Sequence, residues 1–191
     1  MEIDENIDNV YQQSINNLNK VLSNNPTQTY IDVLNTIIEA RQIVILARRN
    51  SLGPAHLLNV HINEVLSKSR VVNGECAEAF DLLRGLTKED VVFNIAIPSY
   101  SNRMMQYSNY LAEKEITQVS ITDSHSNTFA NNAKHLLLVS GDSLSFANSH
   151  LSTNFIIDVL IYLLTLDKQS EILKTLEDMK ILNERFGISG N

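Results

Sequence analysis

The feature that most constrains this chain is a short apolar run that ends in a polar turn and leads into a helical segment. Residues 43–47 are all aliphatic, and Ser51 follows after Arg48-Arg49-Asn50. Residues 91–97 repeat the pattern, and Ser99 and Ser101 then precede the next helical segment. The first N–H groups of a helix are unpaired and carry a partial positive charge, so each turn is a potential anion-binding position.

Short apolar runs alternate with helical segments from residue 42 onward, which indicates βαβ units and a parallel sheet. Five strands are expected, at 42–47, 69–73, 90–97, 118–122 and 135–139. The helices of this part are expected at 51–67, 76–86, 102–114, 127–131, 145–166 and 170–186. The aliphatic character of the strands suits a sheet covered on both faces, so we predict a three-layer α/β/α fold.

The order of the strands cannot be determined from one sequence, and the flavodoxin-like order 2-1-3-4-5 is the one we predict for five parallel strands. In that order the strands at 42–47 and 90–97 are neighbours, and their helices leave from opposite faces of the sheet. A crevice then opens at the carboxyl ends of these two strands. Both serine-containing turns would lie at this crevice.

The first forty residues are predicted to form a pair of helices ahead of the sheet. The second helix is expected from Pro26 to Ala40, with Asn25 as its capping residue. We therefore divide the chain into a helical linker or dimerisation segment, residues 1–40, and an α/β domain, residues 41–191.

Composition excludes several classes of protein. The net charge of −7 opposes generic binding to nucleic acid or to an anionic membrane. No apolar run approaches the ~20 residues that span a bilayer, and the acidic N-terminus is unlike a secretory signal. Cys76 is the single cysteine, which fits a reducing cytoplasm. Neither zinc-ligand spacing, a nucleotide-binding glycine loop nor a nucleophile elbow is present, so no metal or cofactor is expected.

Four segments together resemble a known family. They are residues 43–55, 98–101 and 120–124 and the aliphatic helix that contains 155–158. In their order and spacing the chain resembles the SIS (sugar isomerase) domain over about residues 35–168, most closely the effector domain of RpiR/MurR-type transcription regulators. The resemblance implies a five-stranded α/β/α sandwich that binds phosphorylated sugars, usually as a dimer.

The sequence departs from the family pattern in both turns. The usual first turn is G-x-G-x-S, and Ala47 and Arg49 occupy its glycine positions while Ser51 is retained. The usual turn after the third strand is S-x-S-G-x-T, in which Ala96 and Pro98 replace the serines and Ser101 occupies the threonine position. Two serines that would line the site are therefore missing.

The candidate ligand-binding residues each have an ordinary structural alternative. Hydroxyls of Ser51, Ser99 and Ser101 could donate to phosphate oxygens, or the three serines could be helix caps. Arg49, or its neighbour Arg48, could bind a phosphate. Alternatively, these arginines could pair with the surface carboxylates Glu75 or Glu78.

Two further pairs are weaker candidates. His61 and Glu64 share a helix face and could act as base and orienting group in an isomerase, or could belong to a solvated helix face or a dimer contact. Asp123 and Ser124 follow the fourth strand and could form the lip of the crevice, or could be an ordinary capping turn.

The leading hypothesis is a non-catalytic module that senses a phosphorylated sugar or amino sugar. A phosphosugar isomerase is the alternative, and a scaffold that only dimerises is a third. Regulators of this type carry a helix-turn-helix domain before the linker, and Met1 stands where the linker begins. We therefore expect this chain to lack a DNA-binding element and to make no direct contact with nucleic acid.

Assembly is predicted from apolar positions that one sheet face cannot cover. The helix around residues 159–166 is apolar nearly all round, and Ile7, Tyr11, Ile15 and Leu18 form a further stripe. Exposed apolar patches of this kind mark interfaces, and a two-fold dimer is the commonest closed arrangement. We expect a homodimer, or a higher homo-oligomer, built by these outer helices.

Overall fold

The central element is a parallel sheet of five strands. The structure is a computed structural model that describes residues 3–187, and within these residues the strand order is β2-β1-β3-β4-β5. The strands are β1 (Ile43–Ala47), β2 (Ser69–Asn73), β3 (Val91–Ala96), β4 (Thr117–Thr122) and β5 (His135–Leu138). All four pairings are parallel. The predicted fold class and the order 2-1-3-4-5 are confirmed. The outer ends of the two predicted domains, residues 1–2 and 188–191, lie outside the described part.

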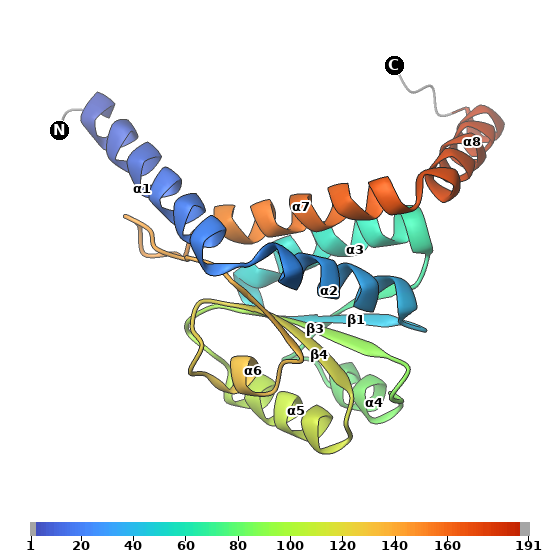
Figure 1. Cartoon of the computed structure of the whole chain (residues 1–191), viewed down its shortest axis with the longest axis horizontal. Helices are drawn as coiled ribbons and strands as arrows, with labels where there is room; N and C mark the ends of the chain where they lie inside the picture. The colour runs from blue at the N-terminus through green and yellow to red at the C-terminus, as the bar shows by residue number, and fades with distance from the viewer. Residues whose placement is uncertain (1–2, 188–191) are drawn as a thin grey trace.

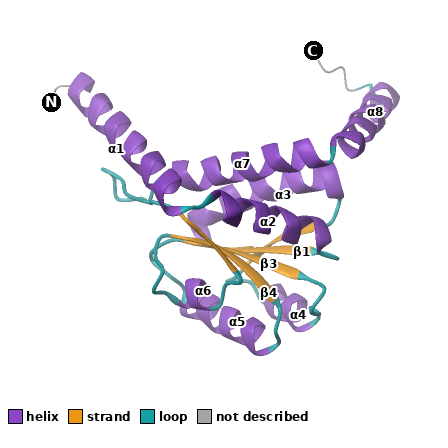
Figure 2. Ribbon diagram, in the orientation of Figure 1, coloured by secondary structure: helices purple, strands orange, loops and turns teal. Residues whose placement is uncertain are grey.

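Helices cover both faces of the sheet, which gives the three predicted layers (Figures 1 and 2). One face carries α2 (Thr27–Glu39), α3 (Leu52–Leu66) and α7 (Leu151–Asp167). The opposite face carries α4 (Glu78–Arg84), α5 (Asn102–Glu113) and the short α6 (Thr128–Asn131).

The middle strand β1 shows why its sequence is aliphatic throughout. Ile43 and Ile45 pack in the core on the side of α2, α3 and α7, whereas Val44 and Leu46 pack in the second core on the side of α4 and α5. Successive side chains of a strand point to opposite faces. A strand covered on both sides therefore needs apolar residues at every position.

Two helices extend away from this body. In Figure 1, α1 (Ile3–Asn24) and α8 (Gln169–Phe186) project from opposite ends of the layer that contains α7. The described residues of α8 include none that is buried. The first half of α1 exposes a row of large apolar side chains, namely Ile3, Ile7, Val10 and Tyr11.

The junction of α1 and α2 differs from the prediction. Pro26 is the capping position of α2, and Asn25 does not cap the helix. The buried Asn25 side chain instead donates to the carbonyl oxygens of Val21 and Leu138 and accepts from the Leu138 N–H, at 2.7 to 2.8 Å. Asn25 therefore joins the helix pair to the end of β5, because a buried amide is stable where its polar atoms are all paired.

The predicted helix at 145–166 begins later than expected, at Leu151. The preceding residues form a loop in which serine hydroxyls accept from nearby backbone N–H groups. Ser143 Oγ accepts from Ser145 N at 3.1 Å, and Ser145 Oγ accepts from Ala147 N at 3.2 Å. Such local bonds compete with helical ones, so the serines stop the helix from extending toward the sheet. The loop is free to lie over the carboxyl edge.

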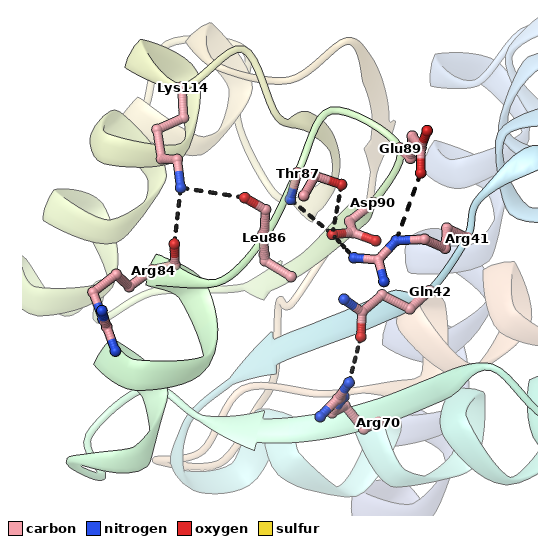
Figure 3. Close-up of polar contacts among 9 residues, drawn as sticks. All are labelled: Arg41, Gln42, Arg70, Arg84, Leu86, Thr87, Glu89, Asp90 and Lys114. Carbon is pink, nitrogen blue, oxygen red and sulfur yellow. Dashed lines mark hydrogen bonds and ion pairs between the residues drawn. The ribbon is translucent and has the colours of Figure 1, made fainter.

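The amino edge of the sheet is fastened by charged side chains (Figure 3). Arg41 Nη2 donates to the fully buried Asp90 carboxylate at 2.6 Å, and the Thr87 N–H donates to the same oxygen at 2.8 Å. Lys114, the residue that follows α5, donates to the carbonyl oxygens of Arg84 and Leu86. These contacts fix the loops that lead into β1 and β3.

No helix within residues 3–187 has both the length and the apolar character that a membrane span requires.

Candidate functional site

A crevice opens at the carboxyl ends of β1 and β3, as the strand order predicts. Its volume is about 360 Å3, and its lining comes from the turn after β1, the turn after β3 and the loop before α7. The sequence candidates Arg49, Ser51, Ser99 and Ser101 all line it. Because α3 and α5 leave from opposite faces of the sheet, their N-terminal turns face each other across this space.

The turn after β1 places an arginine in a backbone conformation that glycine normally adopts. Arg49 has φ +50°, in the left-handed region. This position is one of the two at which the family pattern has glycine, and here it carries a cationic side chain. Ser51 is buried in the short 3-10 turn Arg49–Ser51, and its side chain makes no capping hydrogen bond. Ser51 thus occupies the capping position of α3, but the alternative in which its hydroxyl caps the helix is not realised.

The turn after β3 places its two serines differently. Ser99 is exposed, and its backbone oxygen accepts from Arg48 Nη1 at 3.2 Å. Ser101 is buried and caps α5, where its Oγ accepts from the Met104 N–H at 3.4 Å. The same hydroxyl donates to Glu75 Oε1 at 2.6 Å. Ser101 therefore caps α5 and at the same time donates to a carboxylate of the chain itself.

Glu75 lies outside the residues that line the crevice, but its carboxylate contacts two that do, Arg48 and Ser101. Its carboxylate accepts from Ser101 and forms an ion pair with Arg48, whose Nε lies 3.1 Å from Oε1 without an aligned hydrogen bond. The hydrogen bond from Ser101 holds the pKa of the Glu75 carboxyl below its usual value. The positive charges of Arg48, Arg103 and Arg49 lower that pKa further. A protein of net charge −7 therefore concentrates three arginines around one carboxylate.

The loop that carries Glu75 lies close against α5. A Cβ atom on the preceding residue, Gly74, would come within 2.6 Å of Met104 Cγ. Gly74 therefore permits a close approach that a larger residue would prevent, and Met104 itself lines the crevice.

A second hollow of about 380 Å3 adjoins the crevice. The two share Ile97, Pro98 and the loop residues 146–148, and the second hollow also has Lys20, Asp123 and Asp142 in its lining. Asn148 Nδ2 donates to the Pro98 carbonyl oxygen at the boundary between them. Sequence reasoning missed Asn148 and its neighbours because it placed them in a helix.

Asp123 and Ser124 have separate surroundings. Asp123 accepts a hydrogen bond from the Tyr100 hydroxyl, and Tyr100 lines the crevice while Asp123 lines the second hollow. Burial, and then the hydrogen bond to Asp123, raise the pKa of Tyr100. Ser124 lines neither hollow, and its Oγ accepts from the Ser126 N–H at 3.2 Å in a local turn.

The weak catalytic candidates lie away from the crevice. His61 Nδ1 and Glu64 Oε2 are 2.8 Å apart on α3, so the predicted pair exists. Neither residue is part of the lining of either hollow. Within residues 3–187, histidine, cysteine, aspartate and glutamate side chains form no group of three or more that could hold a metal ion.

Comparison with known proteins gives the family. The SIS domain family matches residues 36–180, which is most of the chain. The chain belongs to the SIS domain family. The comparison with curated proteins found no match.

Several solved structures are similar to this chain in fold. The RpiR transcription factor from Sphaerobacter thermophilus (sugar isomerase domain) aligns with a TM-score of 0.86 at 17% identity, over 90% of this chain and 96% of that one. NanR from Vibrio vulnificus, complexed with ManNAc-6P, aligns with a TM-score of 0.79 at 13% identity, over 97% of this chain and 70% of that one. A Methanococcus jannaschii protein with an inferred 3-hexulose-6-phosphate isomerase function aligns with a TM-score of 0.69 at 16% identity, over 90% and 97%.

Proposed function

We propose that this SIS domain binds a phosphorylated sugar or amino sugar in the crevice between β1 and β3 and acts as a non-catalytic sensor module of RpiR-type regulation. The observation that carries the proposal is the set of groups around Glu75. A buried serine hydroxyl and three arginine charges already hold a carboxylate there. Hydroxyl and guanidinium groups are strong donors to phosphate oxygens as well.

The roles of the crevice residues in this proposal follow from their positions. Ser101 stands at the N-terminus of the twelve-residue helix α5, where the unpaired N–H groups favour an anion. Arg48 and Arg49 supply positive charge from the facing turn. The sugar then extends toward Asp123 and the second hollow, whose lining is rich in polar groups that can bond to its hydroxyls.

Sensing is favoured over isomerisation by the position of the titratable groups. An isomerase needs a base within hydrogen-bond reach of the carbon-bound proton that it moves. His61 and Glu64 are outside the lining of the crevice, and the family's lining serines are replaced by Ala96 and Pro98. Incubation with a panel of aldose and ketose phosphates tests this point. Turnover well above the buffer rate that is lost in His61→Ala or Glu64→Ala would establish the isomerase alternative.

A homodimer is part of the same proposal, with residues 1–40 as its main contact segment. Large apolar side chains are exposed on three helices, among them Ile3 and Ile7 on α1, Tyr162 on α7, and Leu173 and Phe186 on α8. An interface of ~1,600 Å2 would suffice for a stable dimer. Light scattering at micromolar protein concentration checks the homodimer, and a mass near the monomer value of 21.5 kDa would contradict it.

We further propose that the protein is cytoplasmic and that this chain makes no direct contact with nucleic acid. A gel shift with DNA tests the second point, and a salt-sensitive shift would contradict it.

A thermal-shift screen against a broad panel of sugar phosphates at millimolar concentration tests the central proposal. Ligand at a hundred times its Kd stabilises a folded protein by about 2.7 kcal/mol. We expect a clear increase in melting temperature with at least one sugar phosphate and none with the matching unphosphorylated sugar. The absence of any shift across the panel would contradict the proposal.

A further inference from the structure

We infer that Glu75 is a built-in competitor for the ligand's phosphate, which occupies the anion position of the crevice in the free protein and is displaced when the ligand binds. The inference rests on the proposed function. It names Glu75 as the residue that sets the affinity of the same site for its ligand and the preference of that site for charged ligands.

The groups that contact the Glu75 carboxylate are groups that could also bind a phosphate. Glu75 Oε1 is 2.6 Å from Ser101 Oγ and 3.1 Å from Arg48 Nε. Ser101 and Arg48 come from the two turns that form the crevice, on opposite sides of the switch point. A single carboxylate oxygen therefore occupies the meeting point of the two turns, where a phosphate oxygen would find the same hydroxyl and the same guanidinium.

The loop that carries Glu75 does not need the Glu75 carboxylate to hold its shape. The Gly74 N–H donates to the Ala47 carbonyl oxygen at 2.9 Å, and the Glu75 N–H donates to Asn73 Oδ1 at 3.1 Å. Arg103 Nη1 donates to the Glu75 backbone oxygen at 2.7 Å. Backbone groups thus anchor the loop, and the side chain, which is 41% exposed, can rotate into solvent while the loop stays in place.

The balance of charge around Glu75 favours the replacement of its carboxylate by a phosphate. Arg48, Arg49 and Arg103 all act on Glu75, so the carboxylate neutralises one of three positive charges. A phosphate monoester carries up to two negative charges near neutral pH and offers three acceptor oxygens. A dianion can therefore replace the carboxylate, whereas a sugar without a charged group gains nothing that compensates for separating Glu75 from Arg48.

This exchange makes Glu75 a residue that determines specificity. A ligand must interact with Ser101 and Arg48 more favourably than Glu75 does. This requirement sets a threshold of interaction free energy that favours phosphorylated over neutral sugars. Removing the carboxylate should lower this threshold. Affinity for any small anion should then rise, and the preference for doubly charged ligands should narrow.

Calorimetric titration with inorganic phosphate, and with the sugar phosphate that gives the largest thermal shift, tests the inference. Glu75→Gln keeps the shape of the side chain and removes its charge, and it should bind both probes about tenfold more tightly than the natural protein. Glu78→Gln is the matched control, because Glu78 is an exposed carboxylate on the neighbouring helix α4, and its affinities should be unchanged. Glu75→Asp, which keeps the charge but withdraws it from Ser101, provides a second variant that should also bind more tightly.

The outcomes separate the inference from the proposed function. If the natural protein binds the probes and both Glu75→Gln and Glu75→Asp bind them equally well or more weakly, Glu75 is not a competitor. Sugar-phosphate binding by the crevice would still stand. The absence of binding of either probe to the natural protein and to all three variants overturns the proposed function and the inference with it. Tighter binding in Glu75→Gln with no change in Glu78→Gln supports both.

Discussion

The two edges of the sheet use the same residue types for different purposes. At the amino edge, Arg41 contacts the fully buried Asp90, whose second contact is the Thr87 backbone (Figure 3). At the carboxyl edge, Arg48 contacts Glu75, whose carboxylate is partly exposed beside a hollow of about 360 Å3. Both are arginine–carboxylate pairs, and the second includes Arg48, which lines that hollow.

The surroundings of the acid explain the difference. A buried carboxylate that loses its partners leaves unpaired groups behind, so such a pair stabilises the fold and resists exchange. A carboxylate at a hydrated surface exchanges partners at little cost, because water replaces what it loses. The pair at the amino edge therefore stabilises the fold, whereas the pair at the carboxyl edge can exchange partners more readily.

The largest expected effect is on stability at the amino edge. Asp90→Ala removes the charge-assisted hydrogen bonds to Arg41 and to the Thr87 N–H, and we expect it to lower the free energy of unfolding by about 2–3 kcal/mol. Urea unfolding followed by circular dichroism measures this. Glu75→Ala is the matched variant at the other edge and should lower the free energy of unfolding by much less, because the Glu75 carboxylate is partly exposed to water. Equal destabilisation of both variants would erase the distinction between the edges.

The next effect is on ligand affinity. Ser101→Ala removes a hydroxyl that donates into the crevice, and we expect sugar-phosphate affinity to fall about tenfold. Ser124→Ala removes a hydroxyl of a local turn outside both hollows and should change affinity little. Calorimetry compares the two, and the stability of Ser101→Ala is measured alongside because Ser101 also caps α5. Equal losses of affinity would place the ligand elsewhere.

A smaller loss of affinity is expected for Arg49→Gly. The backbone of Arg49 is left-handed, which glycine adopts without strain, so the turn should keep its shape and the protein its stability. Loss of a positive charge beside the phosphate should weaken binding about fivefold, and the effect should shrink as salt rises. A variant that binds as tightly as the natural protein would show that the Arg49 side chain takes no part in the site.

The smallest expected effect is on the pH dependence of stability, and it concerns two histidines, one near each edge of the sheet. Burial lowers the pKa of His135 at the start of β5 and the pKa of His150 just before α7. Since a lowered pKa favours the neutral form in the folded protein, their contribution to stability is present above the unfolded pKa of about 6.5 and is lost as pH falls below it. The ring nitrogens of His150 have no hydrogen-bond partner among the described residues, whereas His135 contacts Thr36 at 3.1 Å.

Urea unfolding at a pH of about 7.5 and of about 5.5 measures this contribution. His150→Leu should reduce the loss of stability on acidification and should not destabilise the protein at the higher pH. A pH dependence in His150→Leu that equals that of the natural protein would show that His150 contributes nothing to it.

Much of the fold was predictable because burial on both faces leaves a clear mark in sequence. The five strands differ from their predicted ranges by at most one residue at each end, and the strand order matches. Residues 145–150 were wrongly predicted to be helical, since Phe146 and Ala147 suit a helix and the serine hydroxyls of the loop act through backbone contacts. Helical spacing does not report such local competition.

The candidate site was predictable in its position and only in part in its contacts. The serine turns at the ends of two strands placed the crevice correctly, because strand order alone brings such turns together. Glu75 entered the sequence argument merely as a possible surface partner of the arginines. Its contact with Ser101 joins residues 26 positions apart, and only the packing of the loop after β2 against α5 creates it.

A crystal structure of the protein with the sugar phosphate that stabilises it most tests the central claim most directly. The account predicts the phosphate group at the carboxyl ends of β1 and β3, within hydrogen-bond distance of Ser101 Oγ and the Arg48 guanidinium, with the Glu75 side chain turned away from both. A phosphate bound outside this crevice would contradict the account.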